Sequence, residues 1–200
     1  LHDLVTGEVT PLYASSVMGD TIALYYEDGR LKVFSTATGD LITDTAVEPV
    51  EGPQSAMMNN EGDGYVWLEL RDNDRYETTA TRVYGPEGLV SDLTHLQSKY
   101  YFLNYLTTTP EGRPLYYGTA EAPSRNGSLC DVLDETGNVA LGLGDLGGCY
   151  SYYGNSLNQL PDHVFVARRG FYYGWMDTDG KWLYCQSIFS SINADDEMGY

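Results

Sequence analysis

The sequence predicts an all-β fold made of successive antiparallel hairpins, and three observations lead to this prediction. Runs rich in Val, Ile, Leu, Tyr and Phe recur along the chain. Each run is followed by a turn segment that contains Gly, and apolar residues at helical spacing are scarce. The chain has 200 residues and is 42% hydrophobic, which is enough to bury the core of one domain. We therefore expect residues 1–200 to form a single all-β repeat domain.

The clearest hairpin is expected over residues 21–35, "TIALYYEDGRLKVFS". Two strand-like runs flank Asp28-Gly29, a pair suited to the positive φ angles of a type I′ turn. Similar pairs of runs follow at residues 65–85, 100–119, 129–141 and 163–189. The hairpin pattern therefore continues along the whole chain.

Three segments interrupt this pattern. Residues 48–64 contain Pro, Gly and Asn with little periodicity, so we expect a long connection there. Residues 87–99 are expected to hold one short helix, capped by Ser91. Residues 121–128, "EAPSRNGS", are the most loop-like stretch, and we place a boundary between two halves of the chain there.

Two internal similarities indicate repeats. Thr-Gly-acidic-aliphatic sequences occur near both Gly7 and Gly39, which lie 32 residues apart, so the chain is expected to start inside a repeat. Further along, residues 131–139 align without gaps on residues 174–182, with an offset of 43 that pairs Asp134 with Asp177. An offset of this size is typical of a structural repeat unit.

The second copy of that repeat resembles a tryptophan-glycine (WG) repeat over residues 163–199. The motif residues are Tyr173 at the tryptophan position, Gly174, Trp175, Met176, Asp177 and Gly180-Lys181-Trp182, with Phe189 as the later aromatic residue. Residues 129–144 resemble the repeat more weakly, because Cys130 and Asp131 stand at the Trp-Gly positions.

Residues 1–120 resemble the blades of quinoprotein-type β-propellers through their Thr-Gly-acidic-aliphatic turns. This divides the expected domain into propeller-like hairpins over 1–120 and WG-like repeats over 121–200. The WG resemblance implies a bacterial protein at the cell surface or secreted. We expect its signal segment to be missing from this sequence, in which the first methionine is Met18.

The charge of the chain excludes several partners. With 29 Asp and Glu against 11 Lys and Arg, the formal net charge is -18. Nucleic acids and anionic membranes would be repelled, and Arg168-Arg169 is the only adjacent basic pair. The sequence contains no run of 18 apolar residues, so membrane insertion is not predicted. Neutral carbohydrates, cations and protein partners remain as candidates.

The candidate binding residues lie in "YYGWMDTDGKWLY", residues 172–184. In a strand, Tyr173, Trp175 and Asp177 point to one face while Tyr172 and Met176 point to the other. Gly174 is expected to leave room for an aromatic ring to lie over the backbone. The predicted ligand-binding residues are Tyr172, Tyr173, Trp175, Asp177, Asp179, Trp182 and Tyr184.

Aromatic side chains next to carboxylates are typical of sugar-binding surfaces, because a ring stacks on a pyranose while polar neighbours bind its hydroxyl groups. The competing interpretation is that these residues pack within the sheets, which tyrosine also favours. Small acidic groups such as Asp177 and Asp179 suit calcium, but no EF-hand loop is present and turn formation explains them. We expect no metal site and no cofactor.

No catalytic motif is found. His163 follows Pro161-Asp162 and is interpreted as a strand-entry residue, and no nucleophile elbow or phosphate loop is present. Cys130, Cys149 and Cys185 lack zinc-site spacing and permit one disulfide, whose pairing stays open. The sequence therefore predicts a non-catalytic recognition or scaffolding module at a bacterial cell surface. The alternatives are an extracellular carbohydrate-active enzyme with an acidic pair, and a support domain of a longer repeat protein.

Overall fold

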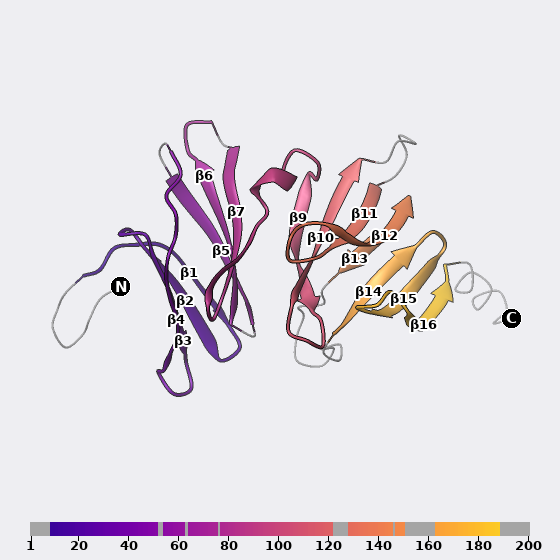
Figure 1. The fold of residues 1–200 in the computed structure, drawn as a ribbon, viewed down its shortest axis with the longest axis horizontal. Helices are drawn as coiled ribbons and strands as arrows, with labels where there is room; N and C mark the ends of the chain where they lie inside the picture. Colours follow the sequence, from indigo (N-terminus) through magenta and orange to yellow (C-terminus); the bar gives the residue numbers. More distant parts are fainter. Residues whose placement is uncertain are drawn as a thin grey trace, which may run out of the picture. The chain divides into compact units, whose positions relative to one another are not determined.

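A computed structural model describes residues 9–51, 54–62, 64–75, 77–121, 128–145, 147–150 and 163–188. Over these residues the chain forms 16 strands and one short 3-10 helix (Figure 1). The strands make four four-stranded sheets, and every pairing is antiparallel. In each sheet the strands follow one another in chain order, which is the meander of a β-propeller blade. The predicted all-β, propeller-like class is confirmed.

The chain divides into two compact units, Leu1–His95 and Leu96–Tyr200. The first unit holds two of the sheets. One consists of β1 (Leu12–Met18), β2 (Thr21–Tyr26), β3 (Arg30–Ser35) and β4 (Leu41–Ala46). The other consists of β5 (Gln54–Gly62), β6 (Tyr65–Asp72), β7 (Glu77–Gly85) and β8 (Gly88–Asp92).

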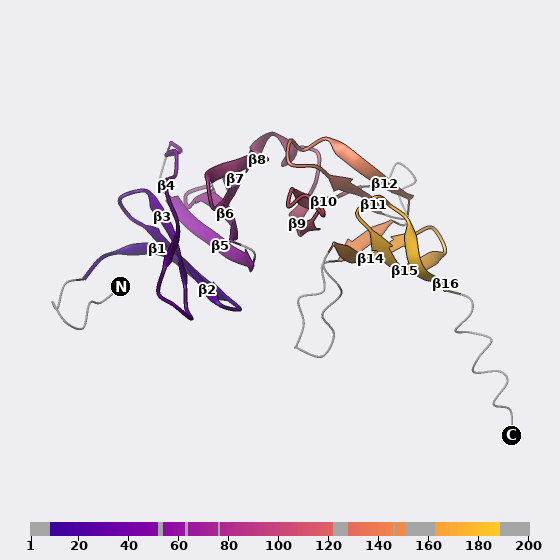
Figure 2. The same ribbon diagram turned by 60° about the horizontal axis from the view of Figure 1, so that its bottom comes forward.

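The second unit holds the other two sheets, which follow the single helical turn η1 (Thr94–Leu96). One consists of β9 (Phe102–Thr108), β10 (Pro114–Glu121), β11 (Ser128–Leu133) and β12 (Val139–Asp145). The other consists of β13 (Gly148–Tyr150), β14 (Val164–Arg169), β15 (Tyr172–Asp177) and β16 (Trp182–Ser187), with β16 at its edge (Figures 1 and 2).

Within each unit the two sheets share an apolar core. In the first unit Ala23 pairs with Val33 and Tyr25 with Leu31, and all four are buried against residues of β6 and β7. Because strand side chains alternate, one face of each strand supplies the core. The core of the second unit is made from both of its sheets in the same way: Leu106, Leu115, Cys130, Val132, Leu143, Cys149, Phe165, Ala167 and Met176.

The β2–β3 hairpin is present, but its turn is not type I′. Gly29 has a φ of 84°, whereas Asp28 does not have a positive φ. The Gly29 amide donates to the Tyr26 carbonyl at 3.0 Å, and the Asp28 carboxylate accepts from the Arg30 amide at 3.0 Å. This is a type I turn followed by one left-handed glycine. The type I′ prediction was wrong because the loop contains three residues rather than two.

The expected long connection at residues 48–64 is mostly strand β5. Its inward residues include buried Met58 and Asn60. Asn60 is satisfied there, because its side-chain amide donates to the Thr21 hydroxyl at 2.8 Å and its backbone amide donates to the Ser16 hydroxyl oxygen at 3.0 Å. The alternation of inward and outward residues in β5 was not recognised in the sequence because one of the inward residues, Asn60, is polar.

The expected helix at residues 87–99 is strand β8 followed by η1. Ser91 is buried in β8 and pairs with Val83, so it does not cap a helix. The Asp92 carboxylate takes that role by accepting from the Thr94 amide at 3.0 Å. The segment therefore forms a strand, because its pairing and burial against β7 outweigh the helical pattern of its sequence.

The loop-like segment near residues 121–128 connects two strands of one sheet. Glu121 of β10 pairs with Ser128 of β11. The division into compact units falls earlier, between His95 and Leu96. The sequence-based division after residue 120 separated two kinds of repeat, and it stays a prediction.

Candidate functional site

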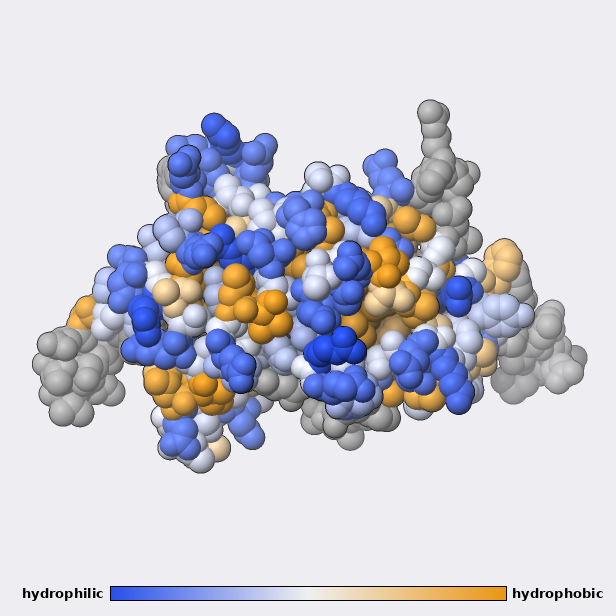
Figure 3. Space-filling model, viewed as in Figure 1, coloured by the Kyte–Doolittle hydropathy of each residue, from blue (hydrophilic) through white to orange (hydrophobic). Residues whose placement is uncertain are grey.

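Exposed apolar residues are common on folded proteins, so only those that lie together indicate a site. On the face drawn in Figure 3, hydrophobic residues form small groups separated by hydrophilic ones. Exposed aromatic side chains in direct contact meet this condition, and sheet β13–β16 contains such a pair.

Trp175 of β15 and Tyr184 of β16 are direct cross-strand partners. Their ring centroids are 6.0 Å apart with an interplanar angle of 58°. Trp175 is 47% exposed and Tyr184 is 53% exposed. Alternation along β15 explains the position of Trp175, because Gly174 and Met176 on either side of it are buried. The two rings therefore form an outward-facing aromatic pair.

A glutamine connects this pair to a third ring. The Tyr184 hydroxyl donates to the Gln186 side-chain carbonyl at 3.0 Å, and the Gln186 amide nitrogen donates to the Tyr173 hydroxyl. Tyr173 and Gln186 are also cross-strand partners. Tyr173, Trp175, Tyr184 and Gln186 thus share one face, which we call the aromatic face. Its polar groups are held in a fixed network.

The neighbouring strand β14 continues this face. Val166 pairs with Trp175 and Arg168 pairs with Tyr173. The Arg168 guanidinium Nε donates to the Gly170 carbonyl at 3.2 Å. One cation therefore lies beside the aromatic residues, on a chain whose formal net charge is -18.

Gly174 has a different role from the expected one. A Cβ at this position would lie against the Tyr184 carbonyl and 2.8 Å from the Cys185 Cα, so it is the backbone of β16 that approaches closely. The expectation of an aromatic ring over Gly174 was wrong. That arrangement is found at Gly118, where a Cβ would lie 2.6 Å from the ring of Tyr100.

Two of the predicted aromatic residues do not join the aromatic face. Tyr172 is exposed, but it neighbours Tyr173 in β15 and its side chain belongs to the opposite face of the strand. Trp182 pairs with Met176, and its half-buried ring packs against the core of the second unit. The structure brings together Tyr173, Trp175 and Tyr184 from the predicted set.

The predicted acidic residues lie in the β15–β16 turn. The Asp177 carboxylate accepts from the Asp179 amide at 3.1 Å and from the Lys181 amide at 2.8 Å. Gly180 has a φ of 80°, and its amide donates to the Asp177 carbonyl at 3.0 Å. Asp177 therefore stabilises its own turn, while the side chain of Asp179 is exposed.

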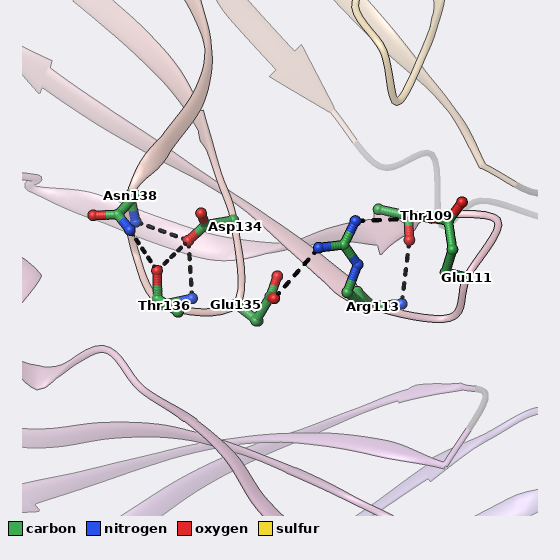
Figure 4. Close-up of polar contacts among 7 residues, drawn as sticks. All are labelled: Thr109, Glu111, Arg113, Asp134, Glu135, Thr136 and Asn138. Atoms are coloured by element: carbon green, nitrogen blue, oxygen red, sulfur yellow. Dashed lines mark hydrogen bonds and ion pairs between the residues drawn. The ribbon is translucent and has the colours of Figure 1, made fainter.

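The β11–β12 turn repeats this arrangement 43 residues earlier, as the internal similarity predicts. The Asp134 carboxylate accepts from the amides of Thr136 and Asn138, each at 2.9 Å, and from the Thr136 hydroxyl at 2.7 Å (Figure 4). Burial opposes ionisation of Asp134, but these hydrogen bonds outweigh it and hold the pKa of Asp134 below its usual value. The shared aspartate is thus a turn residue in both copies.

The turn between β9 and β10 lies beside the Asp134 turn (Figure 4). Arg113 forms an ion pair with Glu135 at 3.6 Å, and a longer one with Glu111 at 3.9 Å. Arg113 is mostly exposed, so these pairs contribute little to stability. The polar groups of this cluster are engaged with one another, and they do not form a candidate binding site.

Other sequence candidates have structural explanations. The His163 ring Nδ1 lies 2.7 Å from the Thr108 carbonyl oxygen, in a residue with a φ of 64° at the start of β14. Within the described ranges, no group of three or more His, Cys, Asp or Glu residues is arranged to hold a metal ion. Phe189, the later aromatic residue of the WG-like motif, lies outside the described residues.

The sequence interpretation missed Gln186 as the polar partner of the aromatic face. The signal was available, because Gln186 follows Tyr184 by two residues and strand side chains two apart share a face.

In the part of the chain that the structure describes, no helix has the length and apolar character needed to cross a membrane.

Three solved structures illustrate what the chain resembles. It is similar to the computationally designed protein Ika8, with 17% identity over 88% of this chain and 48% of that chain and a TM-score of 0.39. It is similar to the Dos1 propeller, with 12% identity over 92% and 49% of the two chains and a TM-score of 0.35. It is also similar to BamB from Moraxella catarrhalis, with 12% identity over 88% and 52% and a TM-score of 0.34.

The chain spans about half the length of these three solved chains. No curated protein matches it. A protein family whose description is "Domain of unknown function (DUF5046)" matches residues 1–196.

Proposed function

The chain belongs to the DUF5046 family, and we propose that it is a non-catalytic recognition module that binds neutral carbohydrate through the aromatic face. The proposed setting is a bacterial cell surface or a secreted protein, with a cell-wall or other glycan polymer as the ligand. The resemblance of residues 163–199 to WG repeats belongs to this proposal.

The observation that carries the proposal is the half-exposed pair Trp175–Tyr184, with Gln186 fixed beside it. A flat ring that is about half exposed offers one side to a pyranose, whose C–H groups pack on it. The Gln186 amide and the hydroxyls of Tyr173 and Tyr184 supply donors and acceptors next to the rings. Recognition sites combine apolar surface with a few placed polar groups in this way.

The net charge favours a neutral ligand. At a formal net charge of -18, the chain repels polyanions at long range, and Arg168, the cation that pairs with Tyr173 beside the aromatic face, is half-buried and bonded to Gly170. Acidic polysaccharides are therefore expected to bind more weakly than neutral ones, and the difference should shrink as salt screens the repulsion.

The test is retention of the protein on insoluble neutral polysaccharides, followed by titration with soluble oligosaccharides of the retained type. We expect Trp175→Ala and Tyr184→Ala each to lower the affinity by about tenfold or more, since stacked aromatic residues are typical of binding hot spots. Tyr101→Ala is the matched control, because Tyr101 is exposed and lies outside sheet β13–β16. Equal retention of all three variants, or no retention of the wild type on any glycan, would exclude the proposal.

A support function for a neighbouring sheet is the second candidate, and one observation favours it. Within each unit a sheet buries one face against its neighbour, and the aromatic face is the other face of sheet β13–β16. A further sheet in a longer protein would cover Trp175 and Tyr184. In that case Trp175→Ala would lower the stability of the parent protein without affecting glycan binding, whereas the recognition proposal expects the reverse.

The enzyme alternative requires two carboxylates that face each other across a cleft. Asp177, the acid nearest in sequence to the aromatic face, is half-buried and accepts two amides of its own turn. We therefore favour binding over hydrolysis for this face. Release of reducing sugar from a retained glycan by the wild-type protein would reverse that preference.

A further inference from the structure

Two of the three cysteines meet in the core of the second unit. Cys130 lies in β11 and Cys149 in β13, which belong to different sheets. Both are fully buried members of the shared core of Leu, Val, Phe and Met side chains. The third cysteine, Cys185, is exposed on β16. The fold therefore brings Cys130 and Cys149 together and keeps Cys185 apart, whereas the sequence left the pairing of the three cysteines open.

The sulfur atoms of Cys130 and Cys149 are 3.1 Å apart, and both are reduced in the structure. A disulfide requires a separation of about 2.05 Å, so the sulfurs need to approach by only about 1 Å. The two strands already lie against each other through the sheet packing. Bond formation thus needs no rearrangement of the sheets.

We propose that Cys130 and Cys149 form a disulfide that links the two sheets of the second unit, and that Cys185 remains a free thiol. The linked residues are separated by 19 positions. Closing a loop of this length restricts the unfolded chain and stabilises the folded one. The bond also anchors β13, which has three residues and pairs only with β14 among the described strands.

The chemistry is thiol–disulfide exchange with an external disulfide, either a small molecule such as oxidised glutathione or a protein disulfide oxidant. One cysteine thiolate attacks the oxidant, which forms a mixed disulfide and releases the first thiol of the oxidant. The second cysteine thiolate then attacks the protein sulfur of that mixed disulfide and releases the second thiol. The two cysteines lose two electrons and two protons, and the oxidant gains them.

The pKa shifts of the two thiols favour this order of steps. The hydrogen bond from Cys149 lowers the pKa of Cys130, and burial raises the pKa of the Cys149 thiol. One sulfur of the pair therefore carries the negative charge more readily, as a nucleophile requires. Because both sulfurs are buried, we expect oxidation during folding or through local opening at β13. The same bond is expected to persist in an oxidising compartment.

The experiment uses the full chain, unfolded under reducing conditions and refolded in a glutathione redox buffer. Thiols are counted under denaturing conditions, the intact mass is measured, and the bond is located by peptide mapping without reduction. We expect the thiol count to fall from three to one, a mass loss of two hydrogens, and a peptide that joins Cys130 to Cys149. We also expect the melting temperature of the oxidised protein to rise on the order of 10 °C.

Two variants complete the test. Cys185→Ser changes only the exposed cysteine, so it should still lose two hydrogens and end with no free thiol. Cys149→Ala should retain both of its remaining thiols. Three free thiols in the refolded wild type, or a mapped bond that includes Cys185, would overturn the proposal. The peptide map of the wild type identifies the bonded cysteines even if Cys149→Ala fails to fold.

Discussion

Replacement of Gly174 by alanine tests how β15 and β16 fit together under the aromatic face. The new Cβ would lie against the Tyr184 carbonyl and 2.8 Å from the Cys185 Cα. Both contacts are with backbone, so no side-chain rotation relieves them. The strand β16 must move away from β15, which weakens their pairing at the bulge beside Trp175. We expect Gly174→Ala to lower the free energy of unfolding by about 3 kcal/mol, at the upper end of typical overpacking costs.

Gly142→Ala is the matched control. Gly142 lies in β12 of the same unit and does not have a positive φ. The nearest atom to its added Cβ is the Asp131 Oδ1 at 3.7 Å, which is an ordinary contact. We expect a change in unfolding free energy of no more than about 0.5 kcal/mol. Its sign should be stabilising, because alanine lowers the conformational entropy of the unfolded chain relative to glycine.

The assay is urea unfolding at 25 °C followed by tryptophan fluorescence, because Trp175 and Trp182 lie in the two affected strands. Hydrogen exchange of the peptide covering residues 163–188 locates the effect. Faster exchange confined to β15 and β16 is the expected result for Gly174→Ala. If both variants unfold within 1 kcal/mol of each other (about the size of a typical substitution effect), the close approach of the two backbones is refuted.

Three further predictions concern the rest of the fold. Asp134→Asn should cost about 1 kcal/mol at pH 7. Because the pKa of Asp134 is lowered in the folded state, this stabilisation is present above the unfolded pKa of about 3.9 and is lost as the pH falls through the folded-state pKa, so the unfolding free energies of the two proteins, measured by urea titration, should converge as the pH falls through that value. Phe165→Ala should cost about 3–5 kcal/mol because the ring is fully buried, whereas exposed Phe171→Ala should change little, and equal melting curves would contradict this. Tyr100→Phe removes the hydroxyl that donates to buried Asp131 at 2.7 Å, so the unfolding free energy should fall by about 1–3 kcal/mol, and an unchanged value would show that Asp131 does not depend on this bond.

The alternation of apolar residues and the Gly-containing turns were sufficient to predict most of the hairpins, but not strands β5 and β8. The β2–β3 hairpin and the repeated Asp134 and Asp177 turns follow directly from their local sequences, because turn chemistry is decided by a few neighbouring residues. Strand β5 was missed, since its inward Asn60 is satisfied by Ser16 and Thr21 from another sheet. Contacts between sheets are not encoded in a local pattern.

The candidate site shows the same limit. Alternation correctly placed Tyr173 and Trp175 on one face of β15. It could not predict the bulge between Trp175 and Met176, which decides that Trp182 pairs inward with Met176 while Tyr184 pairs outward with Trp175. The meeting of Cys130 and Cys149 likewise depends on how β11 and β13 pack, which neither residue's neighbours reveal.

The most direct test of the recognition proposal is ¹⁹F NMR of the protein labelled with 5-fluorotryptophan. The chain has three tryptophans, of which Trp67 is buried in the first unit, Trp182 is half-buried and Trp175 is exposed on the aromatic face. During titration with soluble neutral oligosaccharides, we expect the Trp175 resonance to shift in a saturable way while that of Trp67 stays fixed. Binding that leaves the Trp175 resonance unmoved, or no binding to any oligosaccharide tested, would contradict the account.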